Sequence, residues 1–585
     1  MASKNGRWLF PVLTALFAVL SSVPFLVPGC GWMMLFAFVP LLLMDREATS
    51  RGIRHFWLWH YSAFLLWNAV TTFWVCNATI GGGIFACLAN ALQMSLVFGL
   101  YRWVKKRFCG ASKGAALPYI FLAAAWIAWE KWYLVSAQIS WPWLVLGNAF
   151  ARTLPLAQFY EYTGTLGGSL WVWTSNLAIF GLLSALLSGR WGGRPVFSLP
   201  GFTAFGSVGD AGKCFSAKGG GPFGSFDSTC GAAGGFSAKM KAAVLAGAVL
   251  AVLGPAVWSL CLWGARAGAE EPGRTLSVIA FQPNIDPYNK FSALTQQQQN
   301  AILEDQMRHA LSSSKDTAVL LLAPETFTYD IVPEDIGVSA TYRRFVGFLK
   351  EHPEANLLFG SSTRTYLPAG PRPSQTARQM YDGRWMETHN SAVLIDSTGR
   401  ADIYHKSKLV VGVEMMPYPG FFRHIDEWLG GVMGRDIGQD SVSLLHFRVG
   451  ETDVPIGCAI CYESVYGEHC AEYVSAGAEL LTVITNDAWW GDTPGYKQHL
   501  SYASLRAIET RRWIARSANT GISAIIDPRG RIVASTPWWE KASLPGTVGL
   551  SDCRTFFVRF GDIPGRLSIF VFFLLLAAAI VPRRR

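Results

Sequence analysis

The chain has 585 residues, of which 51% are hydrophobic and only 15% are charged. Soluble domains carry more charge, so this composition excludes a wholly soluble protein and, for most of the chain, a disordered one. The net charge of +10 comes from short basic clusters beside apolar runs, which indicates membrane topology rather than nucleic-acid binding. The eleven cysteines show no spacing typical of a disulfide framework or a four-ligand zinc site.

Eight uncharged stretches predict transmembrane helices, because about 20 apolar residues cross a bilayer. They are residues 8–29, 31–44, 56–78, 79–101, 114–129, 162–189, 242–264 and 567–582. The first seven predict a membrane domain over residues 1–266. The last predicts a C-terminal transmembrane helix and basic tail over residues 567–585.

The basic residues follow alternate stretches. Clusters stand after the second stretch, after the fourth and at the chain's end: Arg46, Arg51 and Arg54, then 102–113, then 583–585. Export disfavours Lys and Arg in short loops, so these loops are predicted to face the cytoplasm. With an even count of eight helices, the polar region between the seventh and the eighth faces away from it.

A stretch rich in Gly, Ser and Ala separates the sixth and seventh predicted helices. The tetrad Phe-Ser-Ala-Lys occurs in it at 215–218 and again at 236–239. Its apolar content is too low for independent folding, so residues 201–240 are predicted to be a flexible cytoplasmic insertion.

A second domain is predicted over residues 274–556, where short β-rich runs alternate with amphipathic stretches. The predicted strands are 275–282, 318–323, 356–362, 391–395, 403–405, 454–460, 480–485 and 521–526. The predicted helices are 292–311, 340–351, 468–476 and 497–512. This alternation favours layered α/β architecture, and the turn at 527–530 predicts a hairpin.

Three predicted strands lead to residues suited to catalysis: Glu325, Lys406 and Cys461. Strand ends fixed by a rigid sheet are the usual place for reactive groups in α/β enzymes. A cysteine thiol is mostly protonated at neutral pH and needs a base, for which Glu325 would serve. Lys406, with the backbone N–H after the nucleophile, would stabilise the oxyanion of a tetrahedral intermediate. The set predicts acyl transfer.

Glu, Lys and Cys in that chain order resemble the nitrilase superfamily of carbon–nitrogen hydrolases. The whole chain is similar to the apolipoprotein N-acyltransferase family, through several motifs. They are Gln282-Pro283-Asn284-Ile285, Pro324-Glu325-Thr326, Tyr404-His405-Lys406, Cys461-Tyr462-Glu463, Asn486-Asp487-Ala488-Trp489-Trp490-Gly491 and Ser140-Trp141-Pro142-Trp143-Leu144.

The resemblance implies an extracytoplasmic nitrilase-like αββα sandwich on a polytopic helical membrane domain of about eight spans. It implies transfer of an acyl chain from a phospholipid, through a cysteine thioester, to the N-terminal amino group of a diacylated apolipoprotein. Neither a metal nor another cofactor is expected, and the protein is expected to be a monomer. The expected location is the bacterial inner membrane, with the catalytic domain in the periplasm.

The family's site residues fall on named positions of this chain. Glu325 falls on the base, Lys406 on the oxyanion partner and Cys461 on the nucleophile. Glu414, Tyr462, Glu463, Trp489 and Phe291 fall on supporting positions around the site. The sequence departs from the family at 411–413, where Val-Gly-Val replaces Pro-Phe-Gly, and at Lys408, where the family usually has His.

Two other classes of protein remain as alternatives. A membrane-tethered amidase or nitrilase would resolve the same acyl-enzyme with water, although a small amide has no need of seven preceding membrane helices. A transporter with a ligand-binding domain is disfavoured, because the predicted spans lack paired charges.

Several polar residues have a competing structural interpretation. Cys458 and Cys461 form a C-x-x-C pair, but residues three apart on a strand point to opposite faces, so Cys458 is predicted to be a core residue. Asn486-Asp487 fits either a site role or a structural turn, and His499 is predicted to be a structural hydrogen-bonding residue. His469 and Cys470 lack a suitably spaced fourth zinc ligand.

Overall fold

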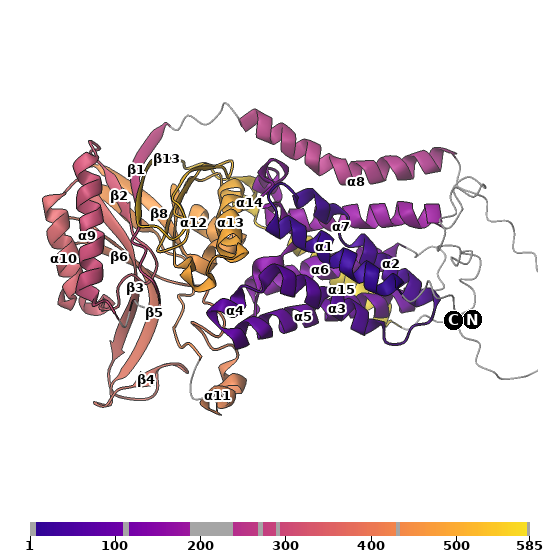
Figure 1. Ribbon diagram of the computed structural model, residues 1–585, viewed down its shortest axis with the longest axis horizontal. Helices are drawn as coiled ribbons and strands as arrows, with labels where there is room; N and C mark the ends of the chain where they lie inside the picture. The colour runs from indigo at the N-terminus through magenta and orange to yellow at the C-terminus, as the bar shows by residue number, and fades with distance from the viewer. Residues whose placement is uncertain are drawn as a thin grey trace, which may run out of the picture.

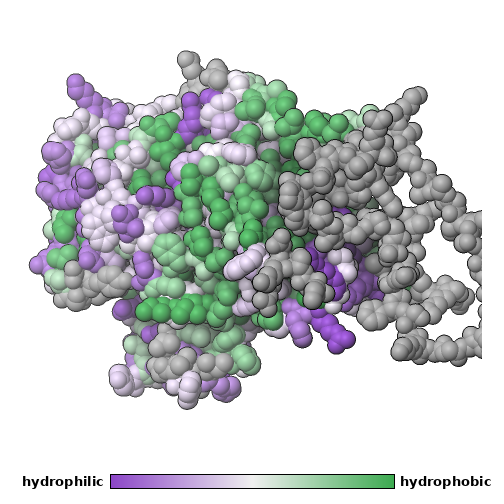
Figure 2. All heavy atoms as spheres, turned by 45° about the vertical axis from the view of Figure 1, so that its right-hand side comes forward, coloured by the Kyte–Doolittle hydropathy of each residue, from purple (hydrophilic) through white to green (hydrophobic). Residues whose placement is uncertain are grey.

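The computed structural model describes residues 8–108, 116–187, 238–266, 273–287, 290, 293–428 and 433–581. Residues 201–237 of the predicted insertion lie outside the described residues, and so does Phe291. A bundle of helices occupies one end of the molecule and a two-sheet α/β sandwich the other (Figure 1). Apolar side chains gather over the helical part, whereas polar ones are frequent over the sandwich (Figure 2).

The helical part is built mainly from the first half of the chain, with one helix added from its C-terminal end. Its helices are α1 (Leu9–Leu26), α2 (Val39–Ser50), α3 (Phe56–Thr72), α4 (Val75–Ala78), α5 (Ile80–Phe108), α6 (Leu117–Val135), α7 (Tyr160–Leu187), α8 (Ala238–Ala265) and α15 (Ile563–Ile580). Short 3₁₀ turns η2 (Gly31–Leu35), η3 (Pro142–Leu144), η4 (Leu146–Phe150) and η5 (Leu154–Leu156) connect them.

Within the described residues, five helices are long and apolar enough to cross a membrane: α1, α5, α7, α8 and α15. The expected count of eight is therefore not confirmed. Residues 31–44 divide into η2 and the start of the 12-residue α2, and a helix of that length spans only about 18 Å. Helix α3 has 17 residues, and α6 carries Glu130 and Lys131, whose charges lower its mean hydropathy.

The core of the helical part is unusually aromatic. Phe38 lies edge-on to Trp67 and Trp126, with ring centroids 6.0 and 5.4 Å away. Tyr462 and Tyr502, which come from the sandwich, belong to the same buried cluster. The sandwich and the helices therefore share one continuous core at their junction.

The sandwich contains two mixed sheets. The seven-stranded sheet has the order β13-β1-β2-β3-β5-β4, with β6 also paired to β5, and the six-stranded sheet has the order β12-β11-β10-β9-β8-β7. The strands are β1 (Arg274–Gln282), β2 (Val319–Leu322), β3 (Ala355–Leu367), β4 (Arg378–Gln379), β5 (Trp385–Ile395), β6 (Ala401–His405), β7 (Leu445–Val449), β8 (Thr452–Ile460), β9 (Leu480–Thr485), β10 (Ile514–Ala518), β11 (Ala524–Ile526), β12 (Ile532–Ser535) and β13 (Ala542–Leu550).

Helices cover the outer faces of both sheets, so the layers are α, β, β and α (Figure 1). On the seven-stranded sheet lie α9 (Gln296–Ser313) and α10 (Ala340–Glu351). Helices α12 (Gly467–Ala476) and α13 (Pro494–Thr510) lie at the other sheet, and α11 (Pro419–Trp428) and α14 (Phe556–Phe560) are peripheral. Along β1, Val278 faces the core between the sheets and Ile279 the core under α9 and α10. This alternation is the period of two expected of a strand.

Each strand and helix predicted for residues 274–556 has a counterpart in the structure, and the hairpin at 527–530 is confirmed as the antiparallel pair β11 and β12. The strands missed from sequence are β4, β7, β10 and β13. Strand β13 contains Pro545 and Gly546, which usually break strands, but it lies at a sheet edge, where a proline is tolerated. In β10 the buried Arg516 interrupts the apolar run.

Candidate active site

The three residues predicted for catalysis come together where the two sheets meet. Glu325 follows β2, Lys406 directly follows β6, and Cys461 directly follows β8 at the start of η8 (Cys461–Val465). Strands β2 and β6 belong to the seven-stranded sheet and β8 to the other. Each residue is thus held by a different strand end, as the sequence predicts.

Lys406 lies between two carboxylates. Its Nζ is 3.0 Å from Glu325 Oε1 and 2.8 Å from Glu414 Oε1, and the lysine is fully buried. The amide of Asn390 donates a hydrogen bond to each of the same two oxygens at 2.8 Å. Burial alone would lower the pKa of Lys406, but the two carboxylates outweigh it and raise that pKa well above its usual value. The ammonium therefore stays charged.

Backbone N–H groups hold the second oxygen of each carboxylate. Asn486 N–H donates to Glu325 Oε2 at 3.2 Å, and Val410 N–H donates to Glu414 Oε2 at 2.7 Å. Residues 411–413, which depart from the family pattern, form a tight turn with Gly412 at φ +82°. This turn presents Glu414 to Lys406, so the altered residues still place the carboxylate.

Cys461 is half-buried and has an unusual backbone conformation. Its φ is +52°, a left-handed value that is costly for a residue with a side chain and is seen most often at functional sites. Burial, and then the charge of Glu325, raise the pKa of the Cys461 thiol well above its usual value, while Lys406 opposes them. The resting thiol is therefore protonated, and its use as a nucleophile requires a base.

Cys458 behaves as the core residue predicted from sequence. It is fully buried, and burial raises its pKa to about 12. Both Cys458 and Cys461 are free thiols. The C-x-x-C spacing therefore combines the core residue Cys458 with the half-buried Cys461.

Glu463 connects the loops that carry Lys406 and Cys461. Its Oε1 accepts hydrogen bonds from Ser407 N–H at 2.6 Å and Lys408 N–H at 3.1 Å, while its Oε2 accepts from Ile460 N–H at 2.8 Å. Burial would raise the pKa of Glu463, but the adjacent His469 and the hydrogen-bond donors hold it below the usual value. One ionised carboxylate thus fixes the backbone beside both Lys406 and Cys461.

Replacing Glu463 by Gln is expected to destabilise the site, because an NH₂ group would face backbone N–H donors. A buried hydrogen bond to a charged group contributes about 2 kcal/mol, so a lower thermal midpoint and slower acylation of Cys461 are expected. Acylation is measured well below that midpoint, by intact mass. Glu351→Gln, an exposed change on α10 far from Glu463, is the control. Equal acylation rates in the two variants would contradict this role for Glu463.

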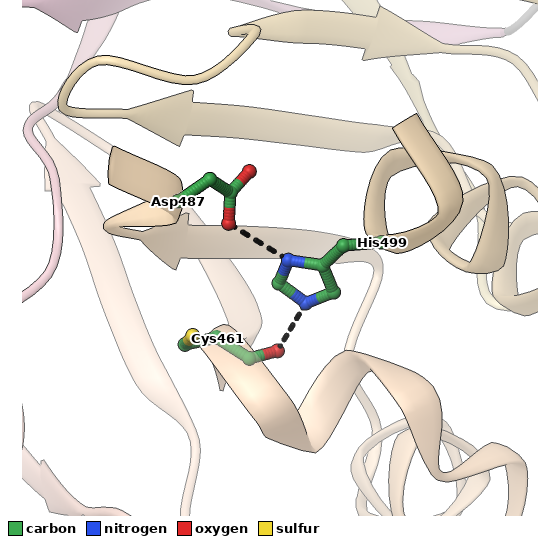
Figure 3. Close-up of side chains that lie close together, drawn as sticks. All are labelled: Cys461, Asp487 and His499. Atoms are coloured by element: carbon green, nitrogen blue, oxygen red, sulfur yellow. Dashed lines mark hydrogen bonds and ion pairs between the residues drawn. The ribbon is translucent and has the colours of Figure 1, made fainter. Parts of the chain in front are cut away.

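His499 supports the other side of the cysteine loop (Figure 3). Its Nδ1 lies 2.9 Å from Asp487 Oδ1, and its Nε2 lies 3.0 Å from the Cys461 carbonyl oxygen. Arg516 pairs with the other oxygen of Asp487. Burial would raise the pKa of Asp487, but Arg516 and His499 outweigh it and lower the pKa to about 2. The sequence-based assignment of His499 as a hydrogen-bonding residue is confirmed, and Asp487 is structural too.

Cys461, Asp487 and His499 are also the one group in the described part of the chain that could hold a metal ion, with ligand atoms within 4.8 Å of one another. The donor set does not fit a cation, because a buried arginine already pairs with Asp487 and because His499 already contacts the Cys461 carbonyl. We therefore assign these three residues to the hydrogen-bond network of the cysteine loop.

Aromatic side chains separate Cys461 from the membrane helices. Tyr462 donates a hydrogen bond to Ser140 O at 3.1 Å and stacks on Trp143 at 6.4 Å. Trp490 packs on Trp74, with ring centroids 4.7 Å apart, while Trp489 is 38% exposed. The segment 140–144 thus docks on the loop that carries Cys461 and Tyr462, and Trp489 is the more exposed of the two neighbouring tryptophans.

Two buried residues of the site were missed from sequence. Asn390 gave no signal, because a single amide at the edge of a predicted strand usually satisfies a turn. Lys290 donates a hydrogen bond to the carbonyl of Thr326, and burial, opposed by Glu325, lowers its pKa to about 8. It stands in a polar run with no apolar periodicity, so burial was not predictable there.

Family models and curated relatives agree on what this chain resembles. Residues 278–556 match the carbon-nitrogen hydrolase family, and residues 15–178 match the apolipoprotein N-acyltransferase N-terminal domain. The apolipoprotein N-acyltransferase of Chlorobaculum tepidum is 26% identical over 558 residues, which cover 94% of this chain and 92% of the relative. That of Geobacter metallireducens is 27% identical over 564 residues, with the same coverage of both chains.

Among solved structures, Saccharomyces cerevisiae Nit3, a member of branch 10 of the nitrilase superfamily, aligns with 54% of this chain and 98% of its own. The sequence identity is 14% and the TM-score 0.34. The assignment rests on the sequence matches, which fall on both parts of the molecule and extend over nearly the whole chain. The chain therefore belongs to the apolipoprotein N-acyltransferase family.

Proposed function

We propose that Cys461 carries an acyl chain from a phospholipid to the N-terminal amino group of a diacylglyceryl-cysteine. The observation that carries this proposal is a half-buried thiol whose electrostatic partners are Glu325 and Lys406, at the junction with the membrane helices. A thioester is activated toward amines, so the reaction needs no nucleotide.

In the first step, Glu325 takes the proton of the Cys461 thiol, and Sγ attacks the ester carbonyl of the phospholipid. Lys406 stabilises the oxyanion that forms. The tetrahedral intermediate collapses with loss of the lysophospholipid alkoxide, which receives the proton from Glu325. The products are a thioester on Cys461 and a neutral lysophospholipid hydroxyl group.

In the second step, the amine of the acceptor attacks the thioester carbonyl. Lys406 again stabilises the oxyanion, and Glu325 accepts the proton that the amine loses. The C–S bond breaks, the thiolate recovers a proton from Glu325, and an amide leaves. The same three groups serve both steps, because both pass through a tetrahedral oxyanion.

The test is intact mass measurement of the full chain in detergent, first with a phospholipid and then with a diacylated lipopeptide. A mass increase of one acyl chain is expected, followed by its loss together with formation of a triacylated lipopeptide. Loss of the adduct to water alone, with the lipopeptide unchanged, would instead support the membrane-tethered hydrolase. Absence of any adduct would overturn the cysteine mechanism.

We further propose that the sandwich faces the periplasm of the bacterial inner membrane. The start of α5 lies by the sandwich, because Asn77, three residues before it, donates a hydrogen bond to Trp490 O at 2.9 Å. Helix α5 has 29 residues, so its basic last turn lies about 43 Å from that start. Lys105 of that turn pairs with Asp45 of α2 at 2.6 Å. The basic ends of α2 and α5 thus lie together, far from the sandwich, and this support does not depend on the number of spans.

An impermeant maleimide applied to spheroplasts checks this orientation. Cys553, which is exposed on the sandwich side of the junction, is expected to react without permeabilisation of the membrane. Cys214 and Cys230 of the glycine-rich segment are expected to react only after the membrane is permeabilised, because they would lie on the cytoplasmic side. Labelling of Cys214 and Cys230 with Cys553 protected would place the sandwich in the cytoplasm.

A further inference from the structure

A cavity lies at the junction between the sandwich and the helices. Its volume is about 520 Å³, within the range of small-ligand sites. It is bounded by the start of α7, the end of α8, strand β13 and helix α14. Glu325, Lys406 and Cys461 are not among its lining residues, so it is separate from the reaction site.

The cavity carries an excess of positive charge. Arg266, Arg511, Arg554 and Arg559 line it. The acidic residue of the lining, Glu161, is already shared by Arg266 at 2.9 Å and Arg511 at 2.7 Å. One carboxylate therefore faces four guanidinium groups. Arg554 and Arg559 are exposed, and Arg554 donates a hydrogen bond to Ser475 O at 3.0 Å.

The cavity also lies at the level where the membrane begins. Helices α7, α8 and α15 are all candidate membrane spans. Helices α7 and α15 start beside the sandwich, and α8 ends there (Figure 1). Tyr162 contacts Trp258 and Phe556, with ring centroids 5.2 and 6.3 Å away. Aromatic rings of this kind gather at the boundary between lipid and water.

An exposed apolar surface on α8, suited to lipid acyl chains, lies beside this cavity. Only 6% of the apolar window of α8 is buried within the protein, and large side chains such as Leu253 and Val257 are exposed along it. Phe560, at the cavity, is 54% exposed. A molecule with an anionic head in the cavity and acyl chains along α8 would satisfy both surfaces.

We infer that this cavity binds the phosphate head group of an anionic phospholipid, distinct from the acyl donor at Cys461. A guanidinium group can donate two parallel hydrogen bonds to two oxygens of one phosphate. The neighbouring aromatic rings would pack on the glycerol and upper chain carbons. Such a lipid would hold the sandwich against α7 and α8. The inference stands apart from the proposed reaction, because none of its residues takes part in acyl transfer.

The test uses the full-length chain with Cys461→Ala, so that no acyl transfer can influence the result. Cys553 lines the cavity, is exposed and is a free thiol, and therefore reports occupancy through its rate of maleimide labelling, measured by peptide mass. Nanodiscs containing phosphatidylglycerol are expected to slow labelling about tenfold when lipid exceeds its dissociation constant tenfold. Nanodiscs of phosphatidylethanolamine alone are expected to give little protection.

Charge variants decide whether the arginines are responsible. Arg559→Gln and Arg266→Gln, made separately, are expected to abolish protection by phosphatidylglycerol, whereas Arg378→Gln, an exposed change on β4, should keep it. Glycerol phosphate and inorganic phosphate serve as soluble probes. Equal protection by these probes would show a site for free phosphate and overturn the lipid assignment. Equal protection by phosphatidylethanolamine, or full protection in both arginine variants, would overturn it as well.

Discussion

Cys461→Ala is expected to lose the acyl adduct completely and to form no triacylated lipopeptide. The thiol is the nucleophile in the proposed first step, and a methyl side chain cannot form a thioester. Intact mass after incubation with phospholipid measures the effect directly. The fold should be retained, because the substitution removes only one sulfur atom at the edge of the core.

Cys458→Ala is the matched control for this prediction. Cys458 lies three residues away, is fully buried and is also a free thiol, but it packs in the core between the sheets. This variant is expected to lose some stability and to keep its adduct. An adduct that persists in Cys461→Ala and disappears in Cys458→Ala would show that Cys458, and not Cys461, is the nucleophile.

Glu325→Gln is expected to slow acylation by about 10²–10⁴-fold, the usual contribution of a general base. The amide keeps the shape of the side chain and can still contact Lys406, whose charge remains balanced by Glu414. Because burial raises the thiol pKa, deprotonation in this variant must come from hydroxide. Its acylation rate is therefore expected to rise with pH over a range in which the wild-type rate is flat.

Glu414→Gln tests whether the base is specific. Glu414 contacts the same lysine nitrogen at nearly the same distance, but Glu325 is the carboxylate whose charge acts on the Cys461 thiol. Glu414→Gln should therefore slow acylation less and should not acquire the pH dependence. Identical losses and identical pH profiles in the two variants would contradict the assignment of Glu325 as the base.

The strand-end residues show how much of the site could be predicted from sequence. Glu325, Lys406 and Cys461 each follow an apolar run whose pattern is local, so the position of each at a strand end follows from a few neighbouring residues. The contacts around them do not. Asn390 lies in β5, and its amide donates to two carboxylates, Glu325 and Glu414, that are 89 residues apart in sequence. Nothing local to Asn390 indicates either partner.

The spans show the same division. The amino-acid sequence already indicates that one part of the chain is apolar enough for a membrane and that another alternates strands with helices, because hydrophobic content and strand periodicity depend on neighbouring residues. It did not determine which apolar stretches become long helices. Residues 31–44 form a 3₁₀ turn and a short helix packed against α1 and α7, since tertiary contacts there offset the shorter length.

The folded structure was needed to show which charges are paired, which loops Glu463 joins and where the arginine-lined cavity opens. Each depends on groups that are distant in sequence and whose interaction energy exists only after the sheets, the helices and the loops have packed. Glu161 and Arg511, for example, are separated by 350 residues and meet at 2.7 Å. The sequence shows that one residue is acidic and the other basic, but it does not show the distance between them, which sets the strength of their charge interaction.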